Sequence, residues 1–89
     1  MIMESDRAMI ARLAAKYGVR RVLLFGSSAD SGRMPHDIDL AVEGLNPRRF
    51  FEFYGELLTG LSLPVDLFDL TQAGKFADLV RKEGLPLYG

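Results

Sequence analysis

Two short apolar runs, separated by a polar segment that begins with glycine, constrain the fold of this chain more than any other feature. The first run is Val22–Phe25, which ends at Gly26, and the second begins at Leu40, directly after Asp37 and Asp39. Runs of this length between polar segments predict two β-strands joined by a loop. Successive side chains of a strand point to opposite faces, so the two aspartates, at spacing two, share one face.

The flanking patterns predict an α-β-β-α-β-α order with a short segment at the end. Asn46 and Pro47 predict a helix start, Thr71 is the expected cap of the last helix, and Gly84 follows its end. The predicted elements are, in order, a helix at 5–17, strands at 20–25 and 37–43, a helix at 47–61, a strand at 64–69, a helix at 71–83, and an edge strand or docking tail at 85–88.

Helical spacing also predicts which side chains of the two later helices pack inward. We expect Phe51 and Phe53 to remain partly exposed. An exposed apolar surplus often marks a partner surface, but a small domain that wraps its helix fully would account for it equally well. The expected inward residues are Phe50, Tyr54, Leu57, Leu58 and Leu61 in the first helix, and Phe76, Leu79 and Val80 in the second.

The positions of the polar residues predict the strand directions. If Gly26 and Asp37 serve one site, the end of the first strand and the start of the second share one sheet edge, so these strands run antiparallel. A right-handed crossover through the next helix then leads to a third strand parallel to the second, which brings Asp66 near the aspartate pair. We therefore expect an α/β (α+β) fold, a small mixed β-sheet of 3–4 strands flanked by helices, in a single domain over residues 1–89.

Composition excludes several classes of protein. The chain has no cysteine, which rules out disulfides and cysteine-based metal sites. Its formal net charge of −1 gives no bulk attraction to nucleic acid, and no apolar run is long enough to span a bilayer. We expect a cytoplasmic protein with no membrane association and no direct nucleic-acid binding, which holds any anionic ligand by local contacts.

Asp37, Asp39 and Asp66 are the candidate catalytic and metal-binding residues. Asp66 lies in an apolar segment, where a carboxylate costs free energy unless it is compensated. Converging carboxylates repel one another, and two Mg²⁺ ions about 3.5–4 Å apart would offset that repulsion and clamp the oxygens of a phosphoryl or nucleotidyl transfer. Any one of these aspartates alone is more simply explained as structural, whereas their combination favours a metal site.

The segment after the first strand supplies candidate nucleotide-binding residues. Gly26 would let a phosphate approach the backbone, Ser27 would donate its hydroxyl and N–H, and Arg33 is the nearest cation by sequence. Each also has a structural explanation, as a tight turn, a helix cap and a solvated loop arginine respectively.

Together these residues resemble the minimal nucleotidyltransferases of the DNA polymerase β superfamily. The family signature is a strand that ends in Gly-Ser, then roughly ten residues, Asp-x-Asp, and a third aspartate on a later strand. Here these are Gly26 and Ser27, Asp37 and Asp39, and Asp66, and the resemblance covers nearly the whole chain. It implies a nucleotidyltransferase-like fold and Mg²⁺-dependent transfer of a nucleoside monophosphate, AMP from ATP or the equivalent from another NTP, to a hydroxyl acceptor.

The resemblance also implies a partner and residue roles. Members are often encoded beside a helical HEPN-type toxin, which they counter as antitoxins, and some transfer AMP to a tyrosine of that toxin. Asp37 and Asp39 would bind both metal ions and the triphosphate, Asp66 would complete the metal site and act as base, and Ser27 would hold the β- and γ-phosphates. Larger relatives add a second domain, so this chain would work poorly alone or borrow that surface from a partner or, as a homo-oligomer, from a second copy.

Two other functions fit parts of the pattern. The first is a non-catalytic antitoxin that neutralises its partner by forming a complex, with the three aspartates idle. The second is a haloacid-dehalogenase-like phosphatase, whose motif is also Asp-x-Asp. That motif follows an apolar strand, whereas a polar loop precedes Asp37 here, and the chain is too short for that fold.

Overall fold

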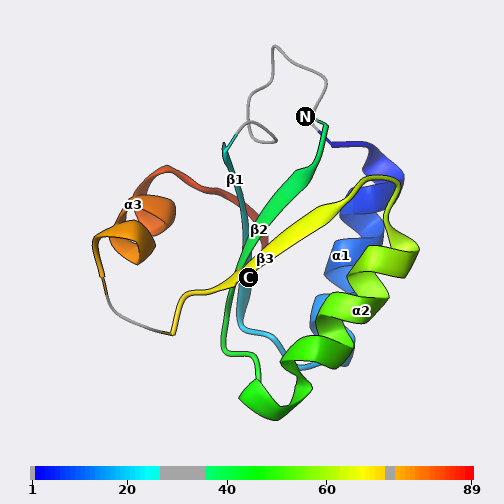
Figure 1. Cartoon of the computed structure of the whole chain (residues 1–89), viewed down its shortest axis with the longest axis horizontal. Helices are drawn as coiled ribbons and strands as arrows, with labels where there is room; N and C mark the ends of the chain where they lie inside the picture. The colour runs from blue at the N-terminus through cyan, green and yellow to red at the C-terminus, as the bar shows by residue number, and fades with distance from the viewer. Residues whose placement is uncertain (1, 27–35, 72–73) are drawn as a thin grey trace.

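The computed structural model describes residues 2–26, 36–71 and 74–89, and Figure 1 shows how their helices and strands are arranged. A four-stranded sheet lies between two helices on one face and one helix on the other (Figure 1). The elements are α1 (Glu4–Lys16), β1 (Arg21–Phe25), β2 (Ile38–Glu43), the 3₁₀ helix η2 (Pro47–Arg49), α2 (Phe50–Gly60), β3 (Val65–Asp69), α3 (Lys75–Glu83) and β4 (Leu85–Tyr88).

The strand directions agree with those predicted from the sequence. The strands lie in the order β3-β2-β1-β4, with β1 antiparallel to both β2 and β4 and with β2 parallel to β3. The segment at 85–88, left open as a strand or a docking tail, is an edge strand beside β1. Helix α2 carries the chain over one face of the sheet from β2 to β3, which lets these two strands run parallel. The sheet is therefore mixed.

The two faces of the sheet carry cores of different size. The larger core lies between the sheet and the helices α1 and α2, and strand residues such as Leu24, Leu40 and Val65 point into it. The smaller core lies under α3 and consists of Leu23, Ala41, Leu70, Ala77 and Val80. Most of the apolar stabilisation therefore comes from the α1–α2 side, and the α3 side is only thinly covered.

The predicted inner face of the second helix was wrong at two positions. Phe53 has an exposed fraction of 0 % and its ring packs edge-on against Tyr17, whereas Leu58 is half exposed. Asn46 caps the segment as expected, since its Oδ1 accepts a bond from the N–H of Arg48 at 3.0 Å, but the turn it caps is η2. Phe50, Phe53, Tyr54 and Leu57 stand at i, i+3, i+4 and i+7 of a regular helix, so the inward stripe is centred on Phe53 and Tyr54 and leaves Leu58 at its border.

The last helix begins later than predicted and turns a different face inward. Helix α3 starts at Lys75, and Thr71 lies in a turn where its N–H donates to Asp69 Oδ1 at 2.9 Å, so Thr71 is not the helix cap. Phe76 and Leu79 are about half exposed, whereas Ala77 and Val80 are buried. Small side chains at the contact bring α3 close to the sheet, which leaves the larger ones at its flanks.

Helix α1 is tied to the end of α2 by a buried acid. Asp6 is buried, accepts a bond from the N–H of Ser62 at 3.0 Å and also accepts one from the Ser62 hydroxyl. This pairing satisfies a carboxylate that burial would otherwise penalise. Within the described residues, no helix has the length and apolar character needed to cross a membrane.

We expect the two neighbouring phenylalanines of α2 to differ sharply in their contribution to stability. Phe53→Ala should lower the free energy of unfolding by ~3–5 kcal/mol, because it empties a site in the larger core. Phe51→Ala, whose side chain is 83 % exposed, should change it by less than ~0.5 kcal/mol. Urea unfolding followed by circular dichroism measures both, and equal losses would contradict the observed orientation of α2.

Candidate functional site

Three carboxylates converge at one edge of the sheet, on the face that α3 covers. Asp37 immediately precedes β2, Asp39 lies in β2 and Asp66 lies beside Asp39 in the parallel register of β3. One oxygen from each of the three carboxylates lies within 4.8 Å of the others. Asp37 and Asp39 are half-buried and Asp66 is exposed, so the cluster opens to solvent on the Asp66 side.

The electrostatics of the cluster favour a bound cation. Burial raises the pKa of Asp39 above its ordinary value, and the negative charges of Asp37 and Asp66 raise it further. A cation among the three would remove this repulsion. Carboxylate oxygens are the ligands that hard divalent ions such as Mg²⁺ and Mn²⁺ prefer, so the residues present fit such an ion.

Gly26 leaves space for the Asp39 carboxylate. A Cβ atom at this position would lie 2.5 Å from Asp39 Oδ2, and the backbone there has φ +68°, which disfavours residues with a side chain. In the antiparallel register Phe25 pairs with Asp39, so Gly26 follows the last paired residue of β1 at the level of the carboxylate. The sequence suggested Gly26 as a phosphate contact, and the structure adds that it makes room for Asp39.

Ser27 and Arg33 lie outside the described residues, so their predicted roles in nucleotide binding stay predictions. Asp69, the remaining acid of β3, is structural, because its carboxylate holds the turn at Thr71.

An aromatic cluster that was not predicted from the sequence lies beside the carboxylates. Phe25, Phe68 and Phe76 form this aromatic cluster, with ring centroids 5.4 Å apart for Phe25–Phe68, 5.8 Å for Phe25–Phe76 and 5.5 Å for Phe68–Phe76. Phe68 and Phe76 are 40 % and 50 % exposed. The alternation of β3 would have indicated part of it, because Phe68 follows Asp66 by two residues and therefore shares its face.

Comparisons with known proteins agree with this geometry. A family model described as Polymerase beta, Nucleotidyltransferase matches residues 8–89. Among curated proteins, a search found no match.

Several solved structures share the fold over most of the chain. A crystal structure of the toxin–antitoxin MntA–HepT is 26% identical with a TM-score of 0.72, covering 98% of this chain and 73% of that chain. A toxin–antitoxin structure with AMP-PNP is 26% identical with a TM-score of 0.74, covering 98% and 74%. A structure of tri-AMPylated Shewanella oneidensis HEPN toxin in complex with MNT antitoxin is 28% identical with a TM-score of 0.71, covering 94% and 70%.

Two glycines with the same backbone conformation allow a test of the Gly26–Asp39 contact. Gly18 and Gly26 both have φ +68°, but a Cβ at Gly18 would meet nothing within 4 Å. Gly18→Ala and Gly26→Ala should each cost ~1–2 kcal/mol of stability through backbone strain. Only Gly26→Ala should also displace the Asp39 carboxylate and reduce the increase in melting temperature that Mg²⁺ produces, measured by differential scanning calorimetry. An equal Mg²⁺ response in both variants would contradict the contact.

The repulsion within the acidic cluster predicts a pH dependence. The pKa of Asp39 is raised above its ordinary 3.8, so the folded state holds the Asp39 proton more tightly than the unfolded state does. Without metal, the free energy of unfolding therefore falls as the pH rises from 3.8 through the raised pKa of Asp39. Asp66→Asn removes one repelling charge, so the pKa of Asp39 should fall and the free energy of unfolding at pH 7 should rise by ~0.2–1 kcal/mol.

The control for this prediction is Asp78→Asn, which changes the net charge equally on the exposed side of α3. Asp78→Asn should not raise the free energy of unfolding at pH 7. NMR titration of the Asp39 carboxyl in EDTA should give the same pKa for Asp78→Asn as for the unsubstituted chain. An unchanged pKa of Asp39 in Asp66→Asn would contradict the coupling between β2 and β3.

Proposed function

Since the chain belongs to the polymerase beta nucleotidyltransferase family, we propose that it transfers AMP from ATP to a protein hydroxyl. The acceptor we propose is a tyrosine of a helical HEPN-type toxin, which the chain thereby neutralises as an antitoxin. The observation that carries the proposal is the convergence of Asp37, Asp39 and Asp66, from two strands far apart in the sequence, at one sheet edge.

The solved relatives support the choice of nucleotide and partner. One is described as an MNT antitoxin in complex with a tri-AMPylated HEPN toxin, and another as a toxin–antitoxin with AMP-PNP. Both align with almost the whole of this chain. A chain of this family that holds the acidic cluster is therefore suited to the same transfer.

We propose that the acidic cluster holds two Mg²⁺ ions. Asp37 and Asp39 would contact both, and Asp66 would complete the site. When bound, such ions stabilise the charge that develops on the attacking and leaving oxygens of a phosphoryl transfer. Burial and, after it, the charges of Asp37 and Asp66 raise the pKa of Asp39, and a cation would relieve the repulsive part of this effect, which supports the assignment.

The residues of the chain would position and deprotonate the acceptor. The acceptor hydroxyl oxygen forms a bond to the α-phosphorus of ATP, the bond from that phosphorus to the β-phosphate oxygen breaks, and pyrophosphate leaves. The hydroxyl proton goes to a carboxylate, and we assign this role to Asp66, which is the exposed member of the cluster and so the one an acceptor can reach. Gly26, Ser27 and Arg33 would hold the phosphates at the end of β1.

Transfer should depend on the acidic cluster and not on nearby acids. With the HEPN-type partner, ATP and Mg²⁺, the partner should gain the mass of AMP moieties, and Asp39→Asn should slow this gain at least ~100-fold because it weakens the hold on the metal. Asp69→Asn is the control, since its amide oxygen can still accept the bond from Thr71. Intact-mass spectrometry measures the gain, and equal labelling by Asp39→Asn and the unsubstituted chain would refute the proposal.

One observation favours non-catalytic neutralisation as the second candidate. Phe51 and Leu58 of α2 are 83 % and 50 % exposed, and exposed apolar side chains on one helix often contact a partner. Phe53, which the sequence also suggested for such a surface, is buried and cannot contribute. Neutralisation that survives replacement of all three cluster aspartates by asparagine, but not Phe51→Ala, would favour this second function over transfer.

A further inference from the structure

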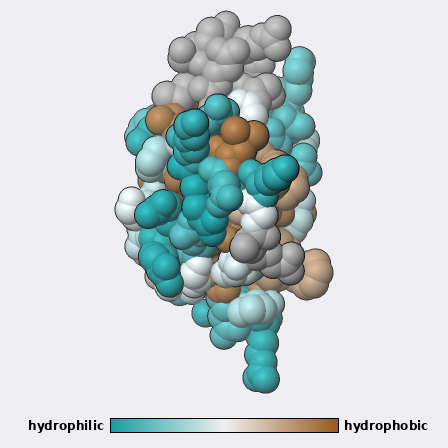
Figure 2. Space-filling model, turned by 90° about the vertical axis from the view of Figure 1, so that its left-hand side faces the viewer, coloured by the Kyte–Doolittle hydropathy of each residue, from teal (hydrophilic) through white to brown (hydrophobic). Residues whose placement is uncertain are grey.

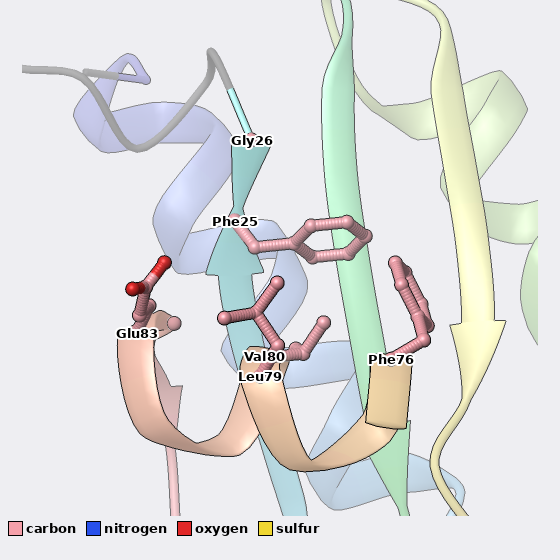
Figure 3. Close-up of a pocket in the computed structure, with 7 residues that line it drawn as sticks. Phe25, Gly26, Phe76, Leu79, Val80 and Glu83 are labelled. Carbon is pink, nitrogen blue, oxygen red and sulfur yellow. The ribbon is translucent and has the colours of Figure 1, made fainter. Parts of the chain in front are cut away.

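We propose that a hollow between the end of β1 and α3 binds the nucleobase of the donor nucleotide, as a base that carries an exocyclic amino group. The hollow has a volume of about 320 Å³ and is lined by Phe25, Gly26, Phe76, Leu79, Val80, Glu83 and Gly84 (Figure 3). This inference rests on the proposed function and assigns the part of the chain that would select the base.

The hollow adjoins the acidic cluster through Gly26 and Phe25. Gly26 lies at its rim and also packs against the Asp39 carboxylate, so the two sites share a residue. Phe25, another lining residue, pairs with Asp39 across the β1–β2 register. A nucleotide with its phosphates at the carboxylate edge would therefore have its base within reach of this hollow. The volume is at the lower end of the range for small-ligand sites, ~300–1,000 Å³.

Aromatic and aliphatic side chains form most of its wall. In Figure 3 the ring of Phe25 points toward Phe76, and Leu79 and Val80 lie below them. Phe76 and Leu79 are each about half exposed, and Figure 2, which faces α3, shows hydrophobic surface among hydrophilic side chains there. Exposed aromatic rings beside a phosphate site provide a stacking surface for a base, because every base has a flat π-face.

Glu83 determines which part of a nucleotide fits here. Its carboxylate stands on the opposite side of the hollow from Phe76 (Figure 3), and it lies in the last turn of α3, where the helix carries partial negative charge. Both charges repel phosphate, so the phosphates belong at the carboxylate edge with its cations and the base belongs in the hollow. An ionised carboxylate only accepts hydrogen bonds, so it favours a base whose amino group donates one.

Isothermal titration calorimetry with the full chain and Mg²⁺ tests the site with three probes: ATP, purine riboside triphosphate, which lacks the amino group, and inorganic tripolyphosphate, which lacks the base. Phe76→Ala should weaken ATP binding about 10-fold and leave tripolyphosphate binding unchanged. Phe76→Leu, which keeps an apolar side chain but removes the ring, should weaken ATP binding in the same direction. Phe51→Ala, the matched control on α2, should change neither affinity.

The amino-group preference is tested through Glu83. The unsubstituted chain should bind ATP several-fold more tightly than purine riboside triphosphate, and Glu83→Leu should abolish that difference while tripolyphosphate binding stays the same. An ATP affinity that is unchanged in Phe76→Ala overturns the base site. If this variant also transfers AMP to the partner more slowly, the hollow is assigned to the acceptor instead. If the unsubstituted chain binds neither ATP nor tripolyphosphate, the proposed function fails as well.

Discussion

The parallel pairing of β2 with β3 is the constraint on which the candidate site depends. Its register sets Asp39 beside Asp66, and a slip of one residue would move Asp66 to the opposite face of the sheet. The register is held by the alternating residues Ile38 and Leu40 of β2 and Val65 and Leu67 of β3, which are buried under α1 and α2. The burial of these residues in the larger core thus stabilises a strand register that places repelling carboxylates together on the other face.

The two faces of the sheet divide stability and function between them. The α1–α2 side buries most of the apolar side chains, whereas the α3 side holds a small core with the aromatic cluster and the hollow at its border. Because α3 contacts the sheet through Ala77 and Val80, it leaves Phe76 and Leu79 accessible to solvent. A helix with a larger inward face would have covered the surface that we assign to the base.

Local patterns in the sequence predicted the strands, and the assumption of one shared site together with the right-handed crossover predicted their directions and the acidic cluster. Apolar runs located the strands, and the spacing of Asp37 and Asp39 placed both on one face. Local patterns were not enough for the helix faces, because α2 and α3 are apolar over more than one face and packing against the sheet decides which face turns inward. Where apolar side chains occupy several faces of a helix, spacing alone does not select the buried one.

The sequence by itself therefore determined the order of elements, the mixed sheet and the identity of the three acids, because these follow from periodicity, residue spacing and the handedness of crossover connections. Only the tertiary structure decided that Gly26 makes room for Asp39, that Phe53 is buried, and that Phe25, Phe68 and Phe76 gather beside the acids. These features are contacts between segments far apart in the chain. Their geometry depends on how helices and strands pack, which the spacing of residues within one segment does not specify.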